Sequence, residues 1–216
     1  MIDALPIMTI KKHKKTKGGR LIYERKKTDT KIICHVILMA VMLVLSIISA
    51  VFIFSNKYPS GFEVSKTINV ATDTLYGISH IINALALAFG IVYMLKGSGK
   101  NAAIYYKIFI QWVTLGILLR LIGTLIGSGF GLSACLMIAI ILLLLVLTIV
   151  KNLGKVKTYI VYYVLLALEV VLAIVTFDKV NTMPSIAGSL TRLVLIGTIG
   201  IAIFAKYADK AARGRD

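Results

Sequence analysis

The sequence predicts an all-α, polytopic membrane protein with six transmembrane helices, and three observations support this. The chain has 216 residues, of which 58% are apolar even before its 17 glycines are counted. Soluble domains average about 45–50% with glycine included. The apolar residues form long runs that a soluble core of this size could not bury. Runs such as 136–150 are apolar at nearly every position, whereas membrane β-strands alternate between polar and apolar residues.

Each expected helix is an apolar segment long enough to cross a bilayer. Crossing about 30 Å of hydrocarbon at about 1.5 Å per residue takes about 20 mainly apolar residues. Six segments qualify, with expected bounds 32–55, 74–95, 102–127, 132–150, 158–177 and 186–205. The first lacks a clear small-residue cleavage site and exceeds the apolar core of a signal peptide, so we expect it to remain as a membrane anchor.

Two glycine-rich segments between the expected spans are interpreted as turns. Segment 96–101 lacks the glycine and the hydroxyl residue that a phosphate-binding loop requires at fixed positions. Segment 127–131 is directly flanked by spans, which leaves no room for the re-entrant support of an ion-selectivity filter. The first is expected to join spans two and three, and the second to be a tight turn on the outer side.

The basic residues predict that both termini are cytoplasmic, because Lys and Arg in short loops are retained on that side. Most of the 25 basic residues lie before span one, around the turns that lead into spans three and five, and in the tail. These residues are Lys11, Lys12, Lys14, Lys15, Lys17, Arg20, Arg25, Lys26, Lys27, Lys31, Lys96, Lys100, Lys107, Lys151, Lys155, Lys157, Lys206, Lys210, Arg213 and Arg215. The chain therefore divides into a basic cytoplasmic segment (1–31), a transmembrane domain (32–205) and a basic cytoplasmic tail (206–216).

The net charge of +16 is explained mainly by this topology. We expect the basic N-terminal segment to contact anionic lipids of the bilayer, because each cation near such a surface contributes about 1 kcal/mol. Nucleic acid is not an expected partner, since Tyr23 is the one aromatic residue available for stacking in that segment. The segments outside the membrane are too short to form a core of their own, so the function must lie within the bilayer or with a partner.

No catalytic, metal-binding or cofactor-binding pattern can be assembled from the sequence. Cys34 and Cys135 differ in expected depth by about 20 Å, too far for a disulfide. His13 and His80 fall on opposite sides of the membrane. Neither a nucleophile with its base nor a zinc-ligand spacing is present. We therefore predict no catalytic residue, metal or cofactor, and an enzyme is the less favoured class.

Ionisable residues inside the spans are the most informative feature. A charge at the centre of a span costs roughly 2.5–3.5 kcal/mol and requires a reason. Arg120, Glu169 and Arg192 occupy such positions, and His80 lies at a similar level. All four are expected about 9–12 Å from the outer boundary. Four different helices thus place ionisable groups in one layer of the outer half.

The helical spacing indicates that these groups point into the bundle. Gly116, Arg120, Gly123 and Gly127 share one face of span three, and small-residue stripes mark close helix contacts. Tyr76, His80 and Asn83 share a face of span two, above Leu87. Spans five and six have corresponding faces around Glu169 and Arg192. The predicted ligand-binding residues are Tyr76, His80, Asn83, Arg120, Glu169 and Arg192.

Two interpretations of this layer remain open. Arg120 and Glu169 could form a structural ion pair while Arg192 extends toward outer lipid phosphates. Alternatively, two arginines and one glutamate leave one positive charge, which a small anionic or carboxylate ligand, or a lipid phosphate, would neutralise.

The function favoured by the sequence is a transport-type protein of the cell membrane, or the substrate-binding subunit of one. Its size and topology are similar to those of the substrate-binding components of energy-coupling-factor vitamin transporters, which have six helices and an outward-facing pocket. The spaced-alanine motif of their first helix is not evident in 40–50, so the similarity is architectural. The alternatives are a non-catalytic immunity, assembly or scaffolding subunit that pairs with another membrane protein, and a lipid-modifying enzyme.

Overall fold

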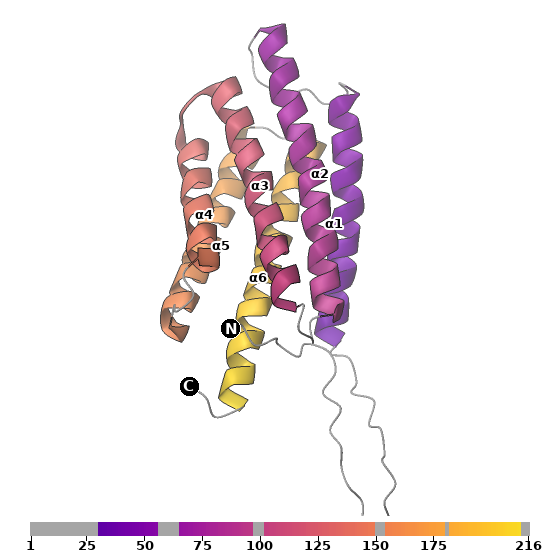
Figure 1. Cartoon of the computed structure of the whole chain (residues 1–216). Helices are drawn as coiled ribbons and strands as arrows, with labels where there is room; N and C mark the ends of the chain where they lie inside the picture. The colour runs from indigo at the N-terminus through magenta and orange to yellow at the C-terminus, as the bar shows by residue number, and fades with distance from the viewer. Residues whose placement is uncertain (1–29, 56–64, 97–101, 150–153, 180–181, 213–216) are drawn as a thin grey trace, which may run out of the picture.

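The computed structural model describes residues 30–55, 65–96, 102–149, 154–179 and 182–212, which form six α-helices (Figure 1). Their bounds are Thr30–Phe54 (α1), Lys66–Lys96 (α2), Ala102–Ser128 (α3), Leu132–Ile149 (α4), Lys155–Lys179 (α5) and Met183–Ala212 (α6). All six are long and apolar enough to cross a membrane. The predicted six-helix polytopic fold is therefore confirmed. The basic segment before Thr30 and the glycine-rich segment 97–101, which was predicted to be a turn, lie outside the described residues.

Two helices extend beyond the spans predicted from hydropathy. α2 begins at Lys66 instead of 74, and its first turn closes on Ser65, whose carbonyl accepts the Asn69 N–H at 3.0 Å. α2 accordingly extends past the other helices at the top of Figure 1. α6 begins at Met183, continues to Ala212 and contains Pro184 in its first turn, where a proline costs no hydrogen bond. Hydropathy marks the hydrocarbon layer, whereas a helix can continue through polar residues outside it.

The helices pack as a ring in chain order, and α6 closes it. Each helix contacts the next one along the chain, and α6 contacts α1, α2 and α3 as well as α5. α6 is the most buried of the six and α4 the least. We call the end of the bundle where α1 ends and α2 begins the Phe54 end, and the opposite end the Lys96 end. α1 begins and α6 ends at the Lys96 end (Figure 1).

The interior has an apolar part and a polar part at different levels. Large side chains such as Leu87, Met94, Phe109, Leu165 and Ile199 are fully buried toward the Lys96 end. Buried polar residues gather from mid-bundle to the Phe54 end. They are Ser46, Ser49, Thr72, Asp73, Ser79, His80, Asn83, Thr124, Glu169, Thr176, Ser185, Ser189, Thr191 and Arg192, whereas two further buried polar residues, Thr158 and Thr198, lie toward the Lys96 end. A buried polar group costs free energy unless it is hydrogen-bonded. The hydrogen-bond partners of these residues therefore indicate whether they serve helix packing or a binding site.

The turn between α3 and α4 has the predicted form. α3 ends at Ser128 and α4 begins at Leu132. Gly129 has a φ of 73°, and its N–H bonds the carbonyl of Leu125 at 3.2 Å. Glycine at the left-handed position just after a helix is a common way to end it. The tight turn between the two spans is therefore 129–131, since Gly127 and Ser128 still belong to α3.

Candidate functional site

The six residues predicted from the sequence lie on four helices that face one another within the bundle. Tyr76, His80 and Asn83 lie on α2, Arg120 on α3, Glu169 on α5 and Arg192 on α6. His80 and Asn83 are 3% exposed, Glu169 is 0% and Arg192 is 1% exposed, while Tyr76 and Arg120 are partly exposed. We call these six residues together with Ser185, Gly188 and Ser189 of α6 the polar layer.

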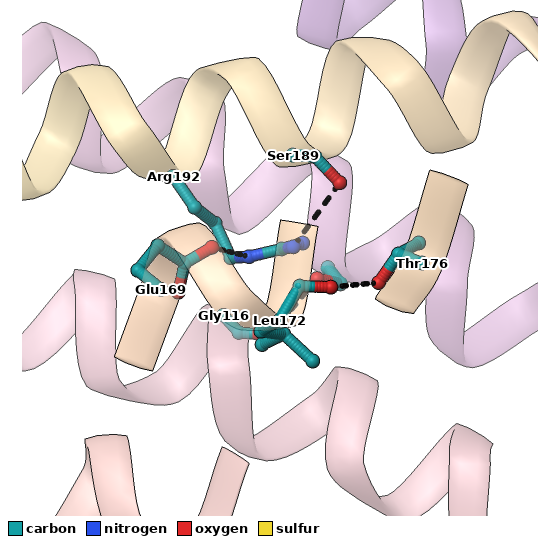
Figure 2. A network of polar contacts seen from close by, with 7 residues as sticks. Gly116, Glu169, Leu172, Thr176, Ser189 and Arg192 are labelled. Carbon is teal, nitrogen blue, oxygen red and sulfur yellow. Dashed lines mark hydrogen bonds and ion pairs between the residues drawn. The ribbon is translucent and has the colours of Figure 1, made fainter. Parts of the chain in front are cut away.

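Glu169 and Arg192 form the ion pair of the polar layer. Arg192 Nε donates to Glu169 Oε1 at 2.6 Å, and Arg192 Nη2 donates to Ser189 Oγ at 3.3 Å (Figure 2). The expectation that Glu169 pairs with Arg120 while Arg192 reaches the lipid phosphates is wrong. The reason is topological: α3 and α5 are not in contact, whereas Arg192 lies on the buried face of α6, which packs against α5.

This ion pair leaves two of its own atoms unsatisfied. Glu169 Oε2 and Arg192 Nη1 are buried and have no hydrogen-bond partner within the described part of the chain. An arginine that bonds a carboxylate through Nε can form a second, parallel hydrogen bond through Nη2, which would satisfy Glu169 Oε2 but not Arg192 Nη1. An unpaired polar atom in the interior costs about 1–3 kcal/mol, and more when it is charged. The pair therefore presents one open acceptor and one open donor.

Arg120 reaches the same region from the opposite side. Its Cζ lies 5.6 Å from the centroid of the Tyr76 ring, a distance at which a cation is attracted to an aromatic face. A Cβ added at Gly188 would lie 2.9 Å from Arg120 Nη1 and 3.1 Å from His80 Cε1. Three helices, α2, α3 and α6, thus converge at the backbone of Gly188, which has no side chain to keep them apart.

The polar layer contains two arginines and the carboxylate of Glu169, and Glu169 pairs with Arg192. Among the residues that the structure describes, Arg120 forms no ion pair with a carboxylate. Gly188 and Arg192 are four residues apart on α6, so they face the same side of that helix. Asp73, which is buried on α2 one turn before Tyr76, brings a second carboxylate to this part of the bundle.

Contacts between α2 and α3 hold the polar layer in place. Ser79 Oγ donates to the carbonyl of Gly116 at 2.8 Å, and the Tyr76 and Thr124 hydroxyls lie 3.1 Å apart. The Asn83 amide lies directly against Gly116. This close approach is the contact that the small-residue stripe of α3 predicts. Ser79 and Thr124 were missed from the sequence, although Ser79 is three residues from Tyr76 and four from Asn83, a spacing that places it on the same face.

The unsatisfied atoms are concentrated in the polar layer and not spread over all buried polar groups. The hydroxyls of Thr72 and Thr176 donate to carbonyls four residues earlier in their own helices, at 2.8 Å and 2.7 Å. In contrast, His80 Nδ1, Asn83 Oδ1 and Ser185 Oγ are buried without a partner among the described residues. Together with the open atoms of the ion pair, they come from α2, α5 and α6. Helix packing alone leaves these groups unsatisfied.

Other polar positions do not form a second site of this kind. His35 Nε2 and Thr198 Oγ1 lie 2.9 Å apart between α1 and α6, toward the Lys96 end. Cys34 and Cys135 are free and exposed, which agrees with the predicted separation. Within the described ranges, no three His, Cys, Asp or Glu side chains lie close enough to bind a metal ion.

The fold and the polar layer define a six-helix, multi-pass membrane protein with a charged interior layer. No family model, curated protein or solved structure matches this chain.

Proposed function

We propose that the protein binds a small anion, of the carboxylate class, in the polar layer, and that it acts as a transport protein or as the substrate-binding membrane subunit of one. The observation that carries the proposal is Arg120, a cation directed into the bundle that has no carboxylate partner among the described residues. A charge costs several kcal/mol inside a membrane unless it is paired. An anion would remove that cost.

The surroundings of Arg120 suit an anionic ligand. A guanidinium presents a planar fork of donors that matches the oxygens of a carboxylate. The Tyr76 ring lies against one side of this fork, and the His80 ring lies beside it at Gly188. Tyr76 and His80 therefore restrict the orientation of the Arg120 guanidinium before a ligand binds. Such preorganisation reduces the entropy cost of binding.

The distribution of buried polar residues supports access from one side. With cytoplasmic termini, as the basic residues predict, the Phe54 end faces away from the cytoplasm of a cell membrane. The polar half of the interior would then face outward, and the apolar half around Leu87, Phe109 and Leu165 would close the bundle toward the cytoplasm. This arrangement fits a protein that takes its ligand from the outer side.

The inward direction of Arg120 favours a ligand over the two alternatives. A partner protein's helix would meet residues on the outer surface of the bundle, whereas Arg120 contacts Tyr76 and the backbone of Gly188. For a lipid-modifying enzyme, the described residues of the polar layer supply no cluster of three His, Cys, Asp or Glu side chains that could bind a metal ion.

Thermal unfolding of the purified protein in detergent, with delipidated samples and constant ionic strength, tests the proposal. Adding acetate or inorganic phosphate should raise the unfolding midpoint in a saturable manner. At 100 times the Kd, the gain is about 2.7 kcal/mol, or about 5–10 °C for a chain of this size. The Arg120→Gln variant should lose this response. Lys107→Gln removes an exposed cation from the same helix and should keep it.

Three outcomes would overturn the proposal. The wild type could show no saturable response to either anion. Alternatively, Arg120→Gln and Lys107→Gln could respond alike, which would assign the effect to general screening of charge. Finally, stabilisation by phosphatidylglycerol but by neither soluble anion would show that Arg120 binds a lipid phosphate as a structural partner.

A further inference from the structure

We infer that Arg192 binds the same anion as Arg120, through its open Nη1 atom, so that the ligand is an oxyanion held between two guanidinium groups. The inference rests on the proposed function, since it requires an anion at Arg120. Arg192 becomes a second binding residue, and Glu169 becomes the residue that positions it. Net charge does not select the ligand, because two buried carboxylates, those of Glu169 and Asp73, accompany the two arginines.

The Arg192 guanidinium is fixed through two of its three nitrogen atoms. Nε donates to Glu169 Oε1 at 2.6 Å, and Nη2 donates to Ser189 Oγ at 3.3 Å. The guanidinium extends from Glu169 on α5 toward Ser189 on α6 (Figure 2). Because the guanidinium is planar and rigid, these two hydrogen bonds also set the position of the third nitrogen atom, Nη1.

Nη1 is the open donor of Arg192. The residue is 1% exposed, and Nη1 has no hydrogen-bond partner within the described ranges. The three nitrogen atoms of a guanidinium point in different directions, so the Glu169 carboxylate that bonds Nε does not also serve Nη1. A buried donor of a charged group costs free energy when it is left unsatisfied. Nη1 therefore calls for an acceptor from outside the described chain.

Arg120 and Arg192 reach the same turn of α6. Long side chains on a helix point toward its N-terminus, and the Arg192 guanidinium accordingly contacts Ser189, three residues earlier. Gly188 is adjacent to Ser189, and a Cβ added at Gly188 would lie 2.9 Å from Arg120 Nη1. The two guanidinium groups thus approach neighbouring residues of one turn, Arg120 from α3 and Arg192 from α6 itself. Like charges repel each other in a buried region, and an anion between them would remove that repulsion.

A carboxylate can bond both groups at once. Its two oxygens together offer about four lone pairs, so one oxygen can accept from the Arg120 fork while the other accepts from Arg192 Nη1. Arginine donates and cannot accept, so both positions require an acceptor oxygen on the ligand. The geometry therefore calls for an oxyanion with at least two such oxygens.

The test observes the two arginines separately, by nuclear magnetic resonance of the full-length protein in detergent with its arginines labelled with nitrogen-15. The Arg120→Gln and Arg192→Lys variants assign the two guanidinium signals, and acetate is the probe. In the wild type, both signals should shift along the same saturation curve, and in Arg120→Gln the Arg192 signal should stay in place. An Arg192 signal that does not move while the Arg120 signal does would refute the inference and leave anion binding at Arg120 intact.

Affinities of two variants assign the contact to Nη1. Arg192→Lys keeps the charge and a donor for Glu169 but lacks Nη1, so its Kd for acetate should rise at least about tenfold, as expected for a lost hydrogen bond from a charged group. Ser189→Ala is the matched control, since it removes the partner of Nη2 and keeps Nη1, and its Kd should stay close to that of the wild type. Equal Kd values in the two variants would refute the role of Nη1. If acetate moves neither arginine signal of the wild type, the proposed function itself fails.

Discussion

The Glu169–Arg192 pair predicts a strong asymmetry between the two arginines of the polar layer. The experiment uses three variants that each remove one charge, Glu169→Gln, Arg192→Gln and Arg120→Gln. It also uses the two double variants that combine Glu169→Gln with either arginine substitution. Arg192 is 1% exposed and contacts Glu169 at 2.6 Å. Arg120 has no such contact among the described residues. Charge removal should therefore have different consequences at the two positions.

The expected magnitudes follow from burial. Breaking a buried ion pair by removing one partner costs about 3–5 kcal/mol. Glutamine at 169 can still accept one hydrogen bond, so we expect about 3 kcal/mol for Glu169→Gln and about 3–4 kcal/mol for Arg192→Gln. Their double-mutant coupling energy should be about 2–3 kcal/mol. Arg120→Gln removes an unpaired charge and its repulsion with Arg192, so without ligand its stability should be within about 1 kcal/mol of the wild type or higher.

Reversible unfolding in mixed micelles, titrated with a denaturing detergent and without added anion, measures these free energies. The Glu169–Arg192 cycle should show the large coupling, and the Glu169–Arg120 cycle should show less than about 1 kcal/mol. A larger coupling to Arg120 than to Arg192 would refute the arrangement of charges described above and restore the Arg120–Glu169 pair that the sequence leaves open.

The glycines supply the remaining predictions. In Gly188→Ala, the added Cβ would displace the Arg120 guanidinium and the His80 imidazole, so the anion affinity measured by titration should fall about tenfold. The gain in helix propensity should leave the free energy of unfolding little changed. Gly197→Ala, whose added Cβ would have its nearest neighbour at 3.9 Å, is the matched control and should gain about 0.5–1 kcal/mol with unchanged affinity; equal affinities in the two variants would contradict the convergence at Gly188. Gly116→Ala would collide with Asn83 and should lose about 1–3 kcal/mol of unfolding free energy. Gly129→Ala, at φ 73°, should lose about 1 kcal/mol in the same assay, and a neutral result would contradict the left-handed turn.

The sequence predicts most of the fold because the bilayer imposes a simple requirement. A segment must be apolar and about 20 residues long to span it, so the six spans and the turn at 127–131 follow from local composition. The helix bounds are less predictable where polar residues continue a helix into water. Lys66 illustrates this, since it is exposed and begins α2 eight residues before the predicted span 74–95.

The residues of the polar layer were predictable, but their pairing was not. Helical spacing indicates which face of a helix Arg120, Glu169 or Arg192 occupies, and equal depth indicates that they can meet. Which residue meets which depends on the order of helices around the ring. α6 packs against α5, and α3 does not. That order is a tertiary property without a local signal, and it decides that Arg192, and not Arg120, takes the carboxylate.

Native mass spectrometry of the protein released from its membrane without added anions tests the central proposal most directly. The wild type should carry one small anion per chain, with a mass that identifies it, and Arg120→Gln should lack that adduct while Lys107→Gln retains it. A wild-type protein free of any small anion, or an adduct that persists in Arg120→Gln, would contradict anion binding at Arg120.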